Sequence, residues 1–314
     1  MFFKKTAPPL LATLQCLAFT PEPGQSYVTV QHHGGRLGDH IIMNLQALYT
    51  ARKLGIPYLL WPASKKPYLY AELDRLVIST CGEHLSLFRN EEKLFKRHVV
   101  IRSLPKKVTP DTLYLVPYGG GIPKIGKSEA RKLLAPLEPL QQVEVPLGHI
   151  SVAIHIRTGG GRGIGKRTFM DNPVNQRKFP HKFISRLGYN HYMRGLKKVR
   201  SLFPEQKLYI HLFTDDLRPE QLVEKLKVAL PEENLCWGWR KEGNFHEHNV
   251  IEDFHDMARF DCLIRPDSNM SGMAEYIGSH CIVIGPCGAK VSSQRCQALK
   301  QRLAEKTIPQ PPAS

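Results

Sequence analysis

A stretch in the middle of the chain combines a buried-strand pattern, two basic side chains and a run of glycines. Residues 152–156 are apolar except for His155, and three glycines beginning at Gly159 end the pattern. His155 and Arg157 alternate onto one face near the carboxyl end of the expected strand, where open α/β sheets bind ligands. The planar guanidinium of Arg157 suits a phosphate, and the amides of Gly159 and Gly160 add further donors. The sequence therefore predicts a polyphosphate site with a histidine beside it.

Polar side chains also follow two later strand patterns, 208–213 and 262–264. In a parallel sheet the carboxyl ends of the strands share one edge, so we expect these side chains to lie near Arg157. Asp216 and Ser271 each have an alternative role: the residue can be a helix cap and take no part in binding. The acidic pair is Asp215 and Asp216, and the second group is Ser268, Asn269 and Ser271.

An earlier strand pattern, 27–31, runs through a glycine-rich turn into a helix pattern over 41–54 that Gly55 ends. A helix N-terminus after such a turn can receive an anion or a sugar hydroxyl. The turn can equally be an ordinary connection. Its residues of interest are Gly35, Arg36, Gly38 and Asp39.

The charge balance indicates anionic partners. The 314 residues carry a formal net charge of +16 and a sequence pI near 9.6, and a field of this sign attracts nucleotide diphosphates and anionic lipids. We expect no nucleic acid partner, because the sequence has no zinc-finger spacing, no RNP-type aromatic motif and no long basic tract. A peripheral membrane contact through the basic surface stays open.

Cysteine usage favours a reducing compartment. The 7 cysteines are an odd number without a Cys-x-x-Cys pair, which argues for free thiols and a cytoplasmic location over a disulfide framework in the secretory lumen. Pro8 and Pro9 interrupt the apolar run that follows Lys4 and Lys5, so we expect residues 1–25 to be a disordered or surface-docking tail and not a signal peptide.

Alternating strand and helix patterns predict an α/β protein with two doubly wound, Rossmann-like domains. We place an N-terminal domain at 26–148, which includes an interdomain region over 118–148, and a C-terminal domain at 149–314. The expected strands are 27–31, 56–61, 98–101, 112–117, 152–156, 208–213, 235–237, 262–264 and 281–284. The expected helices are 41–54, 128–134, 190–202, 219–229, 251–260, one from about Ser271, and 292–306.

Three of these stretches carry a family resemblance. His155-Ile-Arg157-Thr-Gly159 resembles the His-x-Arg-x-Gly-Asp signature of the fucosyltransferase superfamily, although Gly160 replaces the final aspartate. Residues 212–217 resemble the second motif, a strand followed by Ser/Thr-Asp-Asp, and 251–275 resemble the third. The turn at Gly35 to Asp39 is similar to the Gly-Gly-Leu-Gly-Asn-Gln opening of α-1,2-fucosyltransferases, with Asp39 and His40 in place of Asn-Gln.

The resemblance implies a GT-B fold, with the two domains facing each other across a cleft. It implies inverting transfer of fucose from GDP-fucose to a glycan or protein hydroxyl, with no metal and no other cofactor, and with the donor in 149–314 and the acceptor in 26–148. His155 and an acid of the Asp215–Asp216 pair would hold guanine, and Ser268 and Ser271 would meet the β-phosphate. A carboxylate accepts from N1 and the 2-amino group of guanine in a way that adenine does not match.

Catalysis would need cations at the leaving phosphate and a base at the acceptor. Arg157 is the expected cation. The resemblance implies an acidic catalytic residue in the loop after the first motif, and Asp171, the only carboxylate between Glu144 and Glu205, is the candidate for this base. Asp171 can equally be a salt-bridge partner of the surrounding cations, and Asp39 is the alternative base.

Two other functions stay open. Gly160 to Lys166 matches a Walker A loop except that Arg167 replaces the magnesium-binding hydroxyl, which leaves a nucleoside-triphosphatase as one alternative. A catalytically inactive sugar- or anion-binding protein is the other, because Gly160 and Asp39 depart from the family motifs. The basic residues after Arg157 can be solvated, bind an anionic acceptor or order over the donor. They are Arg162, Lys166, Arg167, Arg177 and Lys178.

Overall fold

The computed structural model describes residues 20–31, 37–59, 94–117, 125–135, 142–157, 187–216, 218–240 and 250–307. The chain divides into two compact units. One comprises Met1–Gly35 and Asp39–Leu137, and the other comprises Arg36–Gly38 and Glu138–Ser314. The roles predicted for the two domains, acceptor and donor, stay predictions.

The first unit contains a parallel three-stranded sheet in the order β1-β3-β2. Residues 56–59 are the described part of the strand expected at 56–61, and there Tyr58 forms an isolated parallel bridge with Val28 in place of a strand. Residues 60 and 61 lie outside the described residues. The elements of this unit are β1 (Tyr27–Val30), α1 (Leu37–Leu54), β2 (Arg97–Val100), β3 (Thr112–Val116) and α3 (Lys127–Leu134).

Helix α1 begins earlier than its apolar pattern indicates. The repeat starts at Ile41, but the helix already includes Gly38 and Asp39. Asp39 lies in the first turn, where a carboxylate interacts favourably with the helix dipole. The helix stops as predicted at Gly55, whose φ of 65° is the left-handed conformation that ends helices.

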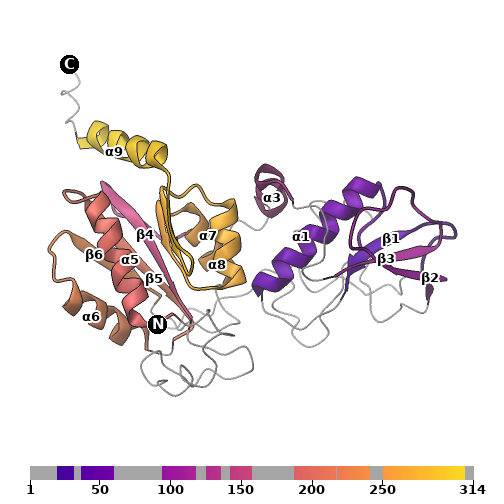
Figure 1. Ribbon diagram of the computed structural model, residues 1–314, viewed down its shortest axis with the longest axis horizontal. Coiled ribbons are helices and arrows are strands. Elements are labelled where there is room, and N and C mark those ends of the chain that lie inside the picture. Colours follow the sequence, from indigo (N-terminus) through magenta and orange to yellow (C-terminus); the bar gives the residue numbers. More distant parts are fainter. Residues whose placement is uncertain are drawn as a thin grey trace, which may run out of the picture. The chain divides into compact units, whose positions relative to one another are not determined.

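The second unit is built on a six-stranded sheet in the order β6-β5-β4-β7-β8-β9. Strands β4, β5 and β6 are labelled in Figure 1. All neighbouring pairs are parallel except β8 and β9. The chain builds outward from β4 in one direction and then crosses back to continue from β7 in the other. The point at which the order reverses therefore lies between β4 and β7. The strands are β4 (His149–Ile156), β5 (Lys207–Thr214), β6 (Leu235–Trp239), β7 (Cys262–Ile264), β8 (Ile282–Gly285) and β9 (Gly288–Val291).

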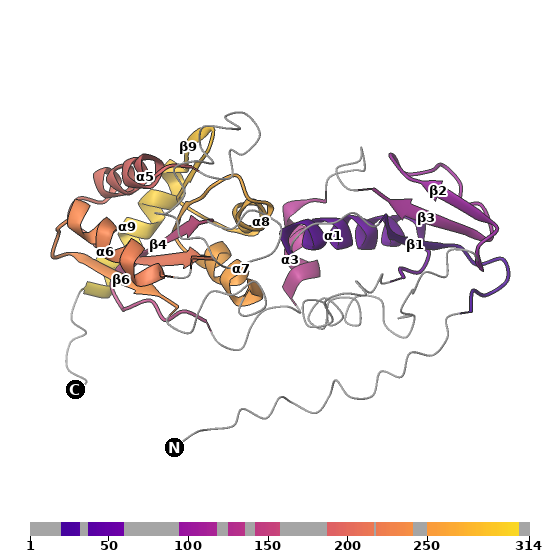
Figure 2. The same ribbon diagram turned by 90° about the horizontal axis from the view of Figure 1, so that it is seen from below.

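Helices cover both faces of this sheet, as a doubly wound fold requires, and α5 and α7 lie on opposite sides of β4 in Figure 2. Ile154 and Leu212 belong to the core under α5 and α6. On the other face Phe260 packs edge-on against Phe213, with 5.6 Å between the ring centroids. The helices are α5 (Tyr189–Leu202), α6 (Pro219–Ala229), α7 (Val250–Arg259), α8 (Asn269–Ile277) and α9 (Ser293–Thr307).

Glycine at 195 allows α5 to approach β7 closely. A Cβ at this position would lie 2.9 Å from Cγ2 of Ile264. The close approach seats α5 over the boundary between β4 and β7.

Strand β9 was not predicted. It is a four-residue edge strand whose side chains are all exposed, so its sequence carries no alternation of apolar and polar residues. Among the described residues, no helix combines the length and the apolar character that crossing a membrane demands.

Candidate functional site

The reversal of strand order creates the candidate site. Ile154 of β4 pairs with Ile264 of β7, and these two neighbouring strands send the chain to opposite halves of the sheet. The loops after such strands diverge and leave room for a ligand at the carboxyl edge. Arg157 follows β4 and Arg265 follows β7 at this edge.

His155 and Arg157 occupy the positions that the sequence predicts. His155 is buried within β4, and Arg157 is half-buried immediately beyond the end of the strand. Arg157 is thus neither enclosed in the core nor fully exposed. Gly159, Gly160, Asp171 and the basic residues after Arg157 lie outside the described residues.

The acidic pair follows β5, the neighbour of β4. Asp216 is 2% exposed, its backbone N–H donates to Oγ1 of Thr214 at 3.1 Å, and its Oδ1 accepts from the N–H of Arg218 at 2.8 Å. Asp215 is half-buried. Burial raises the pKa of Tyr192 above its ordinary value, and the negative charge of Asp215 raises it further. The interpretation of Asp216 as the N-cap of α6 was wrong, because Arg218 is the N-cap and Asp216 closes the preceding turn.

The serine turn opens α8, which follows β7. The helix begins at Asn269 and not at Ser271, and Ser268 is its N-cap residue, with no hydrogen bond from its side chain to the helix. Ser271 is buried in the first turn with its Oγ 3.4 Å from the carbonyl oxygen of Ser268, so it is not a cap. Because the side chain of Ser268 does not cap α8, the first amides of this helix suit an anion.

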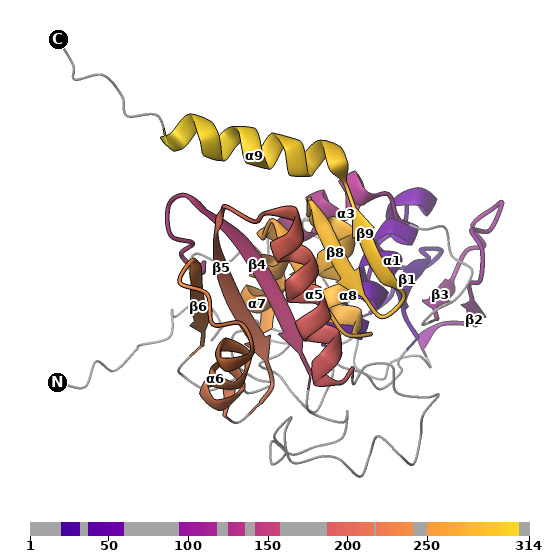
Figure 3. The same cartoon turned by 60° about the vertical axis from the view of Figure 1, so that its left-hand side comes forward.

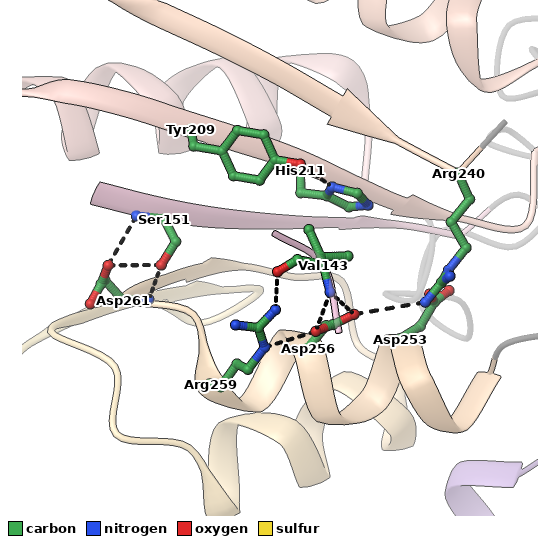
Figure 4. A network of polar contacts seen from close by, with 9 residues as sticks. All are labelled: Val143, Ser151, Tyr209, His211, Arg240, Asp253, Asp256, Arg259 and Asp261. Atoms are coloured by element: carbon green, nitrogen blue, oxygen red, sulfur yellow. Dashed lines mark hydrogen bonds and ion pairs between the residues drawn. The ribbon is translucent and has the colours of Figure 1, made fainter. Parts of the chain in front are cut away.

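The structure also brings together charged residues that the sequence interpretation missed (Figure 4). Nε of Arg240, after β6, lies 2.5 Å from Oδ1 of Asp253 on α7. Asp256, one turn later and fully buried, accepts from Nε of Arg259 at 2.8 Å and from the N–H of Val143 at 3.1 Å. Arg259 donates to the carbonyl oxygen of Val143. The segment before β4 is therefore held to α7 through both backbone groups of one residue.

A buried histidine lies under the same helix. Nδ1 of His211 is 2.9 Å from the hydroxyl of Tyr209 (Figure 4). Burial, followed by the charges of Arg240 and Arg259, lowers the pKa of His211 to about 3, so the ring is neutral. Glycine at 238 makes this arrangement possible, since a Cβ there would lie 2.8 Å from Nδ1 of His211. The pair is a packed internal contact of the sheet.

The predicted N-terminal turn is only partly described. Gly38 and Asp39 lie in the first turn of α1, while Gly35 and Arg36 lie outside the described residues. Within the described part of the chain, no group of three or more histidine, cysteine, aspartate or glutamate side chains is arranged to hold a metal ion. The five described cysteines are free thiols.

The strand order and the switch point define a Rossmann-type α/β unit, and the likeness to solved structures gives the GT-B fold class. The chain is similar to the crystal structure of the fucosyltransferase NodZ from Bradyrhizobium, with 12% sequence identity and a TM-score of 0.51, over 85% of this chain and 98% of that one. A selenomethionine form of the same enzyme matches at 12% identity and a TM-score of 0.50, over 83% and 94% of the two chains. The sequence matches no protein-family model and, at a significant level, no curated protein.

Proposed function

We propose that this protein is an inverting glycosyltransferase that moves fucose from GDP-fucose to a hydroxyl of a glycan or protein without a metal ion. The observation that carries the proposal is the position of Arg157 beside the switch point, with the start of α8, which the Ser268 side chain does not cap, following the adjacent strand. The fold shared with the fucosyltransferase NodZ supports the choice of reaction. The motif resemblance supports the choice of GDP-fucose.

The proposed reaction sets two tasks for the chain. As the bond from the sugar to the β-phosphate breaks, negative charge grows on the leaving diphosphate and positive charge grows on the ring. Arg157 and the first amides of α8 are fixed donors for that negative charge, and Ser268 adds a hydroxyl. Such preorganised donors typically contribute about 2 to 4 kcal/mol each to transition-state stabilisation.

The second task is to remove the proton of the acceptor hydroxyl. The hydroxyl oxygen attacks the anomeric carbon from the side opposite the leaving diphosphate, so the sugar inverts. A base accepts the proton, and GDP departs with the electron pair of the broken bond. We propose Asp171 as this base, with Asp39 as the alternative.

Calorimetry tests the donor assignment. In EDTA we expect GDP to bind more tightly than ADP or ATP, and Arg157→Ala to weaken GDP binding about tenfold or more, as expected for the loss of a charged hydrogen bond. Binding of ATP that requires magnesium would favour the nucleoside-triphosphatase. Binding of GDP-fucose with no turnover on any glycan or protein acceptor would favour the inactive binding protein.

A further inference from the structure

A second arginine lies at the switch point, and its side chain is occupied. Arg265 follows β7, and its Nε and Nη2 lie 2.6 Å and 2.5 Å from Oε2 of Glu275 on α8. Its Nη1 donates to the carbonyl oxygen of Pro266 at 3.0 Å. All three guanidinium nitrogens therefore bind the protein itself.

These contacts tie the turn before α8 to the second turn of that helix. The carbonyl oxygen of Pro266 also accepts from the N–H of Ser268 at 3.0 Å, and the carbonyl oxygen of Ser268 accepts from Gly272 at 2.7 Å. The backbone N–H of Arg265 donates to Ile284 of β8 at 2.9 Å. Arg265 thus joins the sheet, the turn and the helix at one point.

The ion pair is sheltered and extends to a third residue. The side chains of Arg265 and Glu275 are 16% and 15% exposed, whereas Lys290, whose Nζ lies 2.6 Å from Oε1 of Glu275, is 76% exposed. Burial alone would raise the pKa of Glu275, but the hydrogen bond from Lys290 and the charge of Arg265 outweigh burial and hold that pKa below its ordinary value. Glu275 is therefore ionised at neutral pH, and Lys290 offers a control that leaves the inner pair intact.

We propose that Arg265 is a positioning residue: it holds the turn from Pro266 to Ser268 so that the first amides of α8 face the β-phosphate of the bound nucleotide. This inference rests on the proposed function. It differs from a direct role because Glu275 neutralises Arg265, whereas Arg157 is the cation that would touch phosphate. The two roles predict opposite effects of Glu275→Gln.

The first experiment needs no nucleotide. Hydrogen exchange of the full chain, followed by mass spectrometry on peptides covering 265–277, reports the order of the turn and the start of α8. We expect Arg265→Met and Glu275→Gln to speed exchange there by about tenfold, since a hydrogen bond to a charged group is lost, and Lys290→Gln to leave it unchanged. Unchanged exchange in Arg265→Met would overturn the positioning role.

The second experiment compares GDP with GMP by calorimetry. We expect Arg265→Met and Glu275→Gln each to weaken GDP binding about tenfold while GMP affinity changes less than about twofold, because only the β-phosphate loses its amides. An equal loss for both nucleotides would mean a general structural role. Tighter GDP binding by Glu275→Gln would mean that Arg265 contacts phosphate directly, and either result would overturn the proposal.

The two proposals fail separately. A wild-type protein that binds no GDP would sink the proposed function, whatever the exchange rates are. If the wild-type protein binds GDP and the variants keep the wild-type ratio of GDP to GMP affinity, only the proposed role of Arg265 is contradicted.

Discussion

Ser151 and Asp261 hold the starts of β4 and β7 together through reciprocal hydrogen bonds. Oδ2 of Asp261 accepts from the N–H of Ser151 at 2.9 Å and from its hydroxyl at 2.7 Å, and Oγ of Ser151 accepts from the N–H of Asp261 at 2.9 Å. The contact lies at the opposite end of the two strands from Arg157. It fixes the register of the strand pair that forms the switch point.

Removing the Ser151 hydroxyl should therefore destabilise the second unit. We expect Ser151→Ala to lower the free energy of unfolding by about 1 to 3 kcal/mol, because the partly buried N–H of Asp261 loses its acceptor. Urea unfolding followed by circular dichroism measures this change. Ser201→Ala, which removes an exposed hydroxyl bound to the carbonyl oxygen of Lys198, should change the value by less than about 0.5 kcal/mol.

Asp256 should be among the most sensitive charged positions. Replacing it with alanine leaves Arg259 and the N–H of Val143 without their buried acceptor, and we expect a loss of about 3 to 5 kcal/mol in the free energy of unfolding. Glu224→Gln breaks an exposed pair with Lys227 and should cost less than about 1 kcal/mol in the same assay. Equal costs at the two positions would contradict this account of α7.

The pH dependence of stability should reveal two opposing groups. Burial is the main reason that the pKa of Asp253 is raised from 3.8 to about 6, and burial likewise lowers the pKa of His211 from 6.5 to about 3. Between about pH 4 and 6, acidification stabilises the fold through Asp253, which binds its proton more tightly when folded. It destabilises the fold through His211, which binds its proton more tightly when unfolded.

Removing one of the two groups should leave the pH dependence that the other produces. Relative to wild type, His211→Gln should gain about 1.4 kcal/mol in the free energy of unfolding for each pH unit of acidification from about 6 to 4. Asp253→Asn should lose a similar amount over the same window. Urea titrations at three pH values give both slopes, and parallel curves for all three proteins would show that neither pKa is shifted.

The choice of base can be tested separately from donor binding. We expect Asp171→Asn to lower turnover of GDP-fucose by about 10²- to 10⁴-fold with little change in GDP affinity. The same measurement on Asp39→Asn tests the alternative. If turnover survives in Asp171→Asn and is lost in Asp39→Asn, the base is Asp39.

The sequence predicted the central sheet because β4 and β5 are long apolar runs. Such runs can be recognised as strands without knowing which strands they pair with. It was less accurate where structure depends on contacts far apart in the chain. The described part of the strand expected at 56–61 has an isolated bridge at Tyr58 in place of a strand, and β9 exists only because β8 lies beside it.

The same distinction explains which site residues were found. Arg157 was proposed as a site residue because a glycine run marks the end of its strand. Arg265 follows a strand in the same way and was overlooked because its partner Glu275 is ten residues away on a helix. Asp253 and Asp256 lie on the buried side of α7, whose other buried residues are apolar. The three-residue spacing of the two aspartates on this side of the helix indicates a buried ion network.

The reversed direction of β9 has a practical consequence. It returns the chain to the edge where β8 begins, and α9 then lies across the end of the sheet at which β4 and β5 start, with Arg302 bound to Asp261 at 3.0 Å (Figure 3). Helix α9 thus lies at the end of the sheet remote from its carboxyl edge. A fluorescent reporter or a surface-immobilisation handle fused downstream of α9 would leave the carboxyl edge unobstructed for kinetic measurements.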